Sequence, residues 1–195
     1  MKRILPAVLA GLMMTVILTG CSSRSGDEAH AGWSGDWLRV HRNLAVEHPA
    51  GFRLDETSSA VMGDGMFYAA WVAGEGRNVT GAQGAAATAY DAQIYFLAKG
   101  NATAEKAESE LTGWIGREQT FYETDGEPDF TAAGQTFRIL TLRKALRENP
   151  YSRGAAAFAV HGTDTISVEL LCAEDWDGDA QAVLRAFLGG FHFGD

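Results

Sequence analysis

The sequence AAAFAVHGTDTISVELLC, residues 155–172, determines the architecture that we expect for this chain. Apolar residues alternate on both sides of Gly162-Thr163, a pattern that favours two β-strands joined by a two-residue turn with glycine first. The alternating positions are Ala156, Phe158 and Val160 before the turn, and Ile166, Val168, Leu170 and Cys172 after it. We therefore predict a hairpin with one buried face. Because hairpins join antiparallel strands, the surrounding sheet should be largely antiparallel.

Further strand patterns precede this hairpin. Residues 66–73 are apolar throughout, which is typical of a strand covered on both faces. Asp125-Gly126 predicts a hairpin turn between strands at 120–124 and 127–132, and Ala133-Gly134 predicts a second turn before a long strand at 135–146. The glycine-rich residues 74–87 lack phosphate-loop spacing and predict a mobile surface loop.

Two segments show the periodicity of amphipathic helices. The first spans residues 104–115, with Asn101 or Thr103 as its cap, and Gly113 and Gly116 predict its end. The second spans residues 180–188 and ends at Gly189-Gly190. Each helix must bury its apolar stripe on the sheet, so the expected fold class is α+β: a mainly antiparallel β-sheet sandwiched by helices.

Several of these segments carry a family resemblance. The Pro49–Phe52 turn, the strand at 90–98 followed by the helix at 104–115, the Gly134-Gln-Thr-Phe entry to a long strand, the hairpin at 155–172 and the closing Phe187-Leu-Gly-Gly-Phe191 are similar to Mog1/PsbP-like domains. The resemblance spans roughly residues 37–193, although Phe52 replaces the usual Trp. It implies an α/β/α sandwich and transfers no catalytic residue. Known members mostly bind proteins, as photosystem accessory subunits or a GTPase-binding factor.

The amino-terminal segment predicts the location of the protein. Lys2 and Arg3 precede an apolar run from Ile4 to Thr19, which is the plan of a secretory signal peptide. The run ends in Leu18-Thr19-Gly20-Cys21, which resembles the lipobox of bacterial lipoproteins. The resemblance implies cleavage between Gly20 and Cys21, a diacylglyceryl group on the Cys21 thiol, and a fatty acyl chain such as palmitate on the new amino terminus. An uncleaved membrane helix is the alternative.

These patterns divide the chain into three parts. We expect residues 1–20 to be the lipoprotein signal peptide, residues 21–35 to be the lipidated cysteine and a flexible tether, and residues 36–195 to be one α+β domain. Removing the leader would leave 14 basic and 25 acidic residues, a net charge of −11. This charge argues against nucleic-acid partners, which favour basic surfaces.

The sequence contains few candidates for chemistry. With Cys21 lipidated, Cys172 cannot form an intramolecular disulfide, and its strand pattern predicts a buried structural thiol. Asp175, Asp177 and Asp179 are weak metal-site candidates. Their spacing resembles the start of an EF-hand loop, but the glycine comes two positions too early, and capping of the second helix also explains them. The five histidines show no metal-site spacing. Dedicated cofactors and metals are therefore not expected.

Aromatic residues leave two alternatives open. Tyr95, Trp114, Phe121 and Tyr122 lie in adjacent elements and would either line a ligand surface or form part of the core. We expect a lipid-anchored lipoprotein on the extracytoplasmic side of a bacterial cell membrane, with a non-catalytic domain that binds a protein or an envelope component. The alternatives are a small-ligand receptor and a hydrolase with dispersed catalytic residues.

Overall fold

A computed structural model describes residues 37–41, 44–56, 60–62, 66–80 and 86–193. The described residues belong to one compact unit, Trp33–Asp195. The predicted signal peptide, the Gly20–Cys21 cleavage and lipidation site, and the tether at 21–35 lie outside the described residues.

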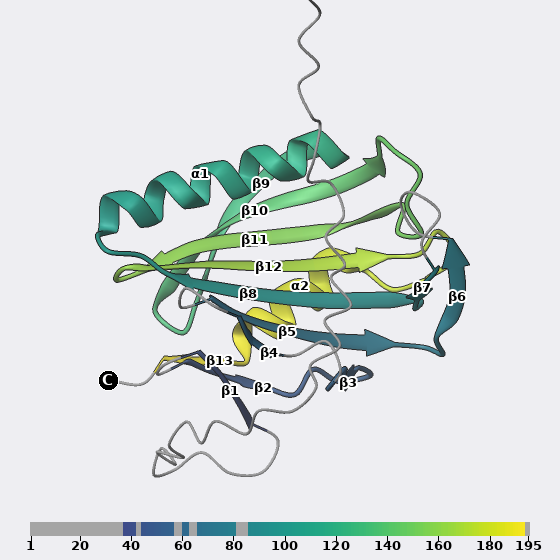
Figure 1. Cartoon of the computed structure of the whole chain (residues 1–195), viewed down its shortest axis with the longest axis horizontal. Helices are drawn as coiled ribbons and strands as arrows, with labels where there is room; N and C mark the ends of the chain where they lie inside the picture. Colours follow the sequence, from purple (N-terminus) through teal and green to yellow (C-terminus); the bar gives the residue numbers. More distant parts are fainter. Residues whose placement is uncertain (1–36, 42–43, 57–59, 63–65, 81–85, 194–195) are drawn as a thin grey trace, which may run out of the picture. The chain divides into compact units, whose positions relative to one another are not determined.

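The domain is built on one large, entirely antiparallel sheet (Figure 1). Seven of its eight strands follow one another in the spatial order β3 (Arg53–Leu54), β5 (Met66–Ala73), β8 (Ala92–Gly100), β12 (Asp164–Cys172), β11 (Arg153–His161), β10 (Gln135–Ala145) and β9 (Tyr122–Ala132). The eighth, β4 (Ala60–Met62), pairs with β5. The predicted antiparallel character of the sheet is therefore confirmed.

The β11–β12 hairpin forms with the predicted two-residue turn. His161 lies opposite Asp164, and Gly162 has a φ of 61°, a conformation that favours glycine. The prediction of one buried face is wrong. Phe158 lies opposite Ser167, so Phe158 and Val168 point to opposite faces of the sheet. Both faces are buried because β12 lies between β8 and β11 at the centre of the sheet.

Helix α1 (Ala104–Phe121) covers one face of the sheet and begins at Thr103, whose side chain accepts from the Lys106 amide at 3.3 Å. It continues five residues past Gly116, where the sequence predicted its end. The cost of a glycine within a helix is about 1 kcal/mol relative to alanine. Here the buried residues Leu111, Trp114 and Glu118, which flank or separate Gly113 and Gly116, hold the helix on the sheet and offset that cost.

The predicted turn at Asp125-Gly126 is wrong. Both residues lie within β9, where they pair with Thr141 and Leu140 of β10, so long-range pairing overrides the local turn preference. The second predicted turn is confirmed. Ala133 and Gly134 have φ values of 50° and 76°, as a two-residue type I′ hairpin turn requires.

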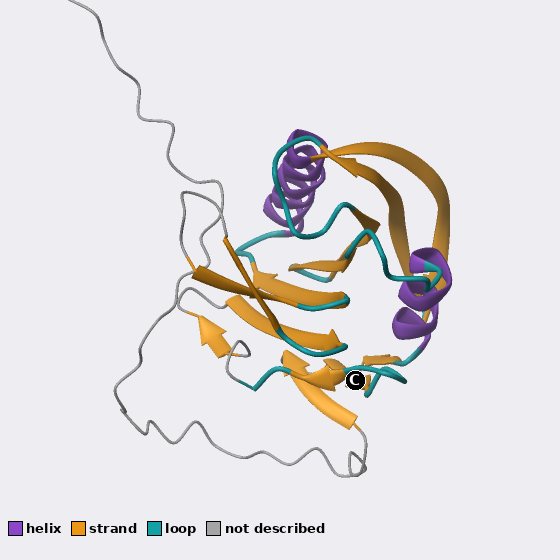
Figure 2. Ribbon diagram, turned by 90° about the vertical axis from the view of Figure 1, so that its right-hand side faces the viewer, coloured by secondary structure: helices purple, strands orange, loops and turns teal. Residues whose placement is uncertain are grey.

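Helix α2 (Ala180–Gly189) covers the opposite face of the sheet, and the sheet separates the two helices (Figure 2). The chain then continues into β13 (Phe191–Phe193), which pairs with β2 (Leu44–Glu47); β2 pairs with β1 (Trp37–His41). The predicted α+β sandwich is therefore confirmed. The structure also corrects the loop predicted at 74–87, because β6 (Arg77–Thr80) and β7 (Ala86–Ala89) form a small antiparallel pair.

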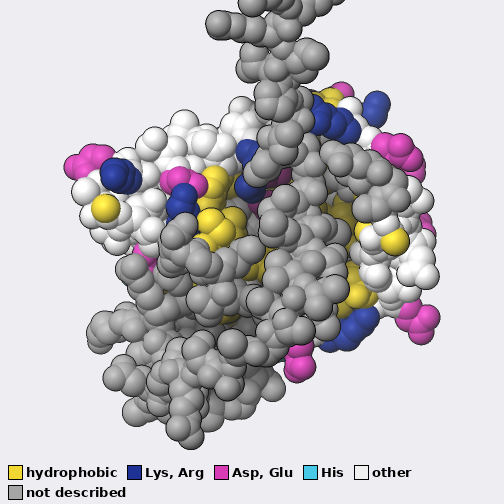
Figure 3. Space-filling model, viewed as in Figure 1, with side chains coloured by type: hydrophobic (Ala, Val, Ile, Leu, Met, Phe, Trp, Pro, Cys, Tyr) yellow, Lys and Arg dark blue, Asp and Glu magenta, His cyan; other side chains and the backbone are white. Residues whose placement is uncertain are grey.

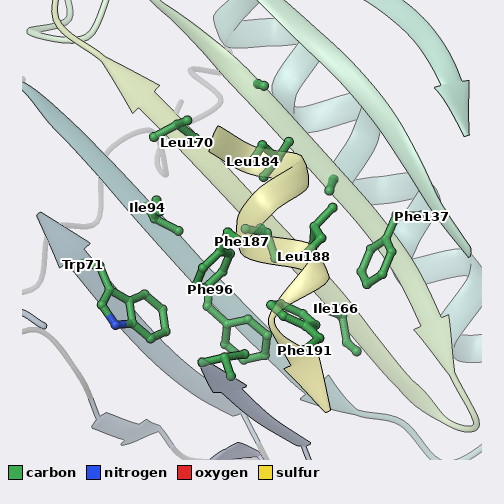
Figure 4. Close-up of a cluster of buried hydrophobic side chains, with 14 of the residues drawn as sticks. Trp71, Ile94, Phe96, Phe137, Ile166, Leu170, Leu184, Phe187, Leu188 and Phe191 are labelled. Atoms are coloured by element: carbon green, nitrogen blue, oxygen red, sulfur yellow. The ribbon is translucent and has the colours of Figure 1, made fainter. Parts of the chain in front are cut away.

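The core between α2 and the sheet is rich in phenylalanine (Figure 4). Phe191 lies at its centre, with ring centroids 5.3 Å from Phe187, 5.8 Å from Phe137 and 5.9 Å from Phe96, all in edge-to-face geometry. Many of the facing sheet residues are alanines, which let the helix approach the strands closely. This side of the sheet is apolar, whereas the α1 side carries most of the buried polar groups.

Candidate functional site

Two glutamates lie in the interface between α1 and the sheet. Helix α1 buries Ala107, Leu111, Trp114 and Glu118, which lie along one stripe of the helix. Glu118 is only 3 % exposed. Facing it from the central strand is Glu169, whose neighbours Val168 and Leu170 point into the opposite core.

Arg117 links the two carboxylates. Its Nε donates to Glu118 Oε1 at 3.3 Å, and its Nη2 donates to Glu169 Oε1 at 3.1 Å. The Ser167 hydroxyl also donates to Glu169 Oε1, at 3.2 Å. One guanidinium therefore serves both acids, while its own side chain is 43 % exposed at the helix surface.

Burial changes the acidity of Glu118. Loss of solvation, together with the charge of Glu169, raises the pKa of Glu118 to about 8, against the opposing effect of Arg117. Glu118 therefore keeps its proton at neutral pH.

Four tyrosines surround the carboxyl pair on the same side of the sheet: Tyr68 of β5, Tyr95 of β8, Tyr122 at the start of β9 and Tyr151 before β11. The Tyr68 and Tyr95 rings lie 5.7 Å apart and their side chains are hydrogen-bonded. Burial raises the pKa of all four phenols, that of Tyr151 to about 12. We call these tyrosines, with Glu118, Glu169 and Arg117, the tyrosine face.

Hydrogen bonds fix the inner tyrosines. The Tyr151 hydroxyl donates to Gln93 Oε1 at 2.7 Å and accepts from the Tyr90 amide at 3.1 Å. The Tyr122 hydroxyl accepts from Asn149 Nδ2 at 2.9 Å and donates to the Tyr151 carbonyl at 3.4 Å. The inner part of the tyrosine face is therefore structural, whereas Tyr68 and Tyr95 are partly exposed and can contact a partner.

Figure 3 views the domain from the side of α1, where apolar surface lies beside Lys and Arg side chains. A shallow groove of about 550 Å³ runs along the first half of α1, lined by Lys99, Asn101, Lys106, Ser109, Glu110, Gly113 and Trp114. Lys99 and Glu110 form an ion pair of 2.9 Å across it. The groove is wide open and does not enclose a small molecule as ligand pockets usually do.

Two of the three aspartates that the sequence offered as weak metal candidates, Asp175 and Asp179, have other contacts. Asp179 caps α2, accepting from the amides of Gln181 at 3.0 Å and Ala182 at 3.1 Å. Asp175 contacts Arg77 at 3.5 Å. Among the residues that the structure describes, no three ligating side chains are grouped as a metal site would require. Helix capping accounts for Asp179 without a metal.

The other predicted residues lie as follows. Trp114 and Tyr122 are buried, and Tyr95 and Phe121 pack partly buried against the same α1-side core. Cys172 is fully buried, as predicted, and burial raises the pKa of its thiol to about 12. His48 contacts the Phe52 carbonyl at 2.7 Å, and His161 contacts Gln135 at 3.2 Å and stacks on the Phe193 ring.

Sequence reasoning did not find Glu118 and Glu169. Glu118 follows Leu111 and Trp114 at helical spacing, so the stripe itself would have included it had the helix not been ended at Gly116. Glu169 alternates with apolar residues and therefore had the pattern of a solvent-facing position.

No protein-family model matches the sequence. No curated protein matches it. Among solved structures, the chain is similar to the solution structure of cyanobacterial PsbP (CyanoP) from Synechocystis sp. PCC 6803, at 13 % identity and a TM-score of 0.44, over 85 % of this chain and 96 % of that one. The fold class stated above rests on the strand order and on the packing of the two helices.

Proposed function

We propose that this chain is a bacterial lipoprotein, held by Cys21 on the extracytoplasmic side of a membrane, whose domain binds a protein or envelope component without converting it chemically. The observation that carries the proposal is Leu18-Thr19-Gly20-Cys21 directly after a basic and apolar leader. One acyl chain gives only marginal membrane binding, whereas the two or three chains of a lipoprotein hold stably. In the described part of the chain, no helix is long and apolar enough to cross a membrane.

The accessible part of the tyrosine face supports a binding role. Tyrosine and arginine are enriched in protein interfaces, because they combine large contact area with directional hydrogen bonds. Tyr68, Tyr95 and Arg117 offer this chemistry on one side of the sheet, and the buried hydrogen bonds behind them keep the surface rigid. A protein surface is therefore the partner that this side of the domain fits best.

The anchor is tested by labelling cells with a palmitate analogue. Cys21→Ser should abolish incorporation and release the protein from membranes or leave it unprocessed. The matched control is Cys172→Ser, which alters the other cysteine of the chain and should retain full labelling. Equal labelling of wild type and Cys21→Ser would refute the lipoprotein assignment.

The binding role is tested separately, by photo-crosslinking on intact cells. A crosslinking amino acid at position 68 should capture a discrete protein partner, whereas the same group at the exposed Glu174 should not. Equal capture from both positions would contradict the tyrosine face as the binding surface. Capture of a small molecule instead would favour the receptor alternative.

A further inference from the structure

The stripe of buried residues that packs α1 on the sheet ends in an acidic residue. The first three buried residues of its stripe, Ala107, Leu111 and Trp114, are apolar, and the fourth is Glu118. Elsewhere Thr165 Oγ1 donates to the Ala107 carbonyl at 3.0 Å and ties the front of the helix to β12. The rear of the helix is held by buried Trp114, by the Leu146 amide, which donates to the Phe121 carbonyl at 2.8 Å, and by the contacts of Glu118 and Arg117. The state of one buried carboxyl group therefore contributes to its attachment.

Groups from every element packed around Glu118 determine which state is stable. Helix α1 contributes Arg117, β12 contributes Glu169, and β9 contributes the Tyr122 phenol; Tyr68 and Tyr95 lie beyond Glu169. Both carboxylates form their described ion pairs with the same guanidinium. With one proton on the pair, the charges of this group cancel. When that proton leaves, one negative charge remains buried against phenols that stay neutral.

We propose that the Glu118–Glu169 pair is a proton-dependent contact that controls how firmly the second half of α1 is held on the sheet, and thereby how far the tyrosine face is covered. This inference concerns the domain alone and holds whether or not Cys21 is lipidated. When Glu118 carries a proton, it can donate a hydrogen bond to Glu169, and the helix stays packed on the sheet (the seated form). Loss of the proton favours the open arrangement, in which water can solvate both carboxylates.

The sign of the pH dependence follows from the raised pKa of Glu118. The seated form keeps the proton up to about pH 8, whereas in an open form the solvated group would lose it near its ordinary value of 4.5. Between these values the seated form binds one more proton than the open form. Opening therefore becomes about tenfold more favourable for each pH unit and levels off above about pH 8, where both forms are ionised.

Amide hydrogen exchange on the full-length mature protein in detergent tests this inference. Protection factors, which are corrected for intrinsic exchange, should fall about tenfold per pH unit between pH 6 and 7.5 for residues 114–121. In Glu118→Gln, which keeps the hydrogen bonds but cannot ionise, they should stay constant. Glu108→Gln removes an exposed acid from the same helix and should behave as wild type. Amides of α2 serve as the reference for opening of the whole domain.

Wild-type protection at 114–121 that does not change with pH, or that changes equally in Glu118→Gln, overturns the inference. Global unfolding also releases the Glu118 proton, so the level of protection separates the two cases: protection at 114–121 equal to that of α2 at every pH would assign the exchange to global unfolding and also overturn the inference. If Glu118→Gln does not fold, Glu169→Gln provides the second test: without the opposing charge, the levelling-off must move to a pH below that of wild type, and an unchanged pH would contradict the pair.

Discussion

Replacing Phe191 by alanine should remove the centre of the α2-side core. The ring is buried and packs edge to face with three other phenylalanines at centroid distances from 5.3 to 5.9 Å. Truncation of a buried phenylalanine costs about 3–5 kcal/mol through lost burial and the cavity left behind. Because the neighbouring rings come from β8, β10 and α2, they cannot all collapse into the space, and we expect a loss of about 4 kcal/mol.

Urea denaturation followed by tryptophan fluorescence measures this loss. With a slope of about 2 kcal/mol per molar urea, the midpoint should fall by about 2 M. Leu146→Ala, at a large apolar residue that is 50 % exposed, is the control and should change stability by less than about 0.5 kcal/mol. A loss below about 1.5 kcal/mol for Phe191→Ala would refute the view that this aromatic cluster organises the core.

Three further predictions follow from local geometry. Gly154→Ala should cost at least about 2 kcal/mol by thermal or urea unfolding, because its Cβ would lie 2.1 Å from the Leu170 carbonyl, whereas Gly126→Ala has open space and should be nearly neutral. Asp179→Ala should cost about 1 kcal/mol through the lost cap, and added calcium should not change the melting temperature of either protein; a calcium-dependent rise in the wild type alone would favour a metal site. Cys172 should resist thiol reagents in the native protein at pH 8 and react after unfolding, since it is buried and its pKa is raised to about 12; rapid native labelling would contradict this.

The α+β class and the order of the main elements could be predicted from the sequence, because alternation, helical periodicity and capping residues are local signals. Thr103 and Asp179, each among the capping residues offered by the sequence, cap the two helices. Gly162 and Ala133-Gly134 lie in the predicted turns. The turn predicted at Asp125-Gly126 does not form, because its local preference is weaker than the pairing of β9 with β10 at nine positions. Local preference decides a structure only where tertiary pairing does not oppose it.

The carboxyl pair could not be predicted for a different reason. Glu118 and Glu169 are far apart in the sequence and become neighbours only when α1 lies on β12. A glutamate in an alternating strand is normally solvent-facing, and the pattern does not indicate that a helix will cover it. The burial of both faces of the central hairpin could not be predicted either, because the same alternating pattern is compatible with one buried face or with two.

The proposed lipid anchor is tested most directly by the mass of the amino-terminal peptide from the membrane fraction. We expect a peptide that begins at Cys21 and carries a diacylglyceryl group together with an amide-linked acyl chain. A peptide that retains residues 1–20, or an unmodified Cys21, would contradict it.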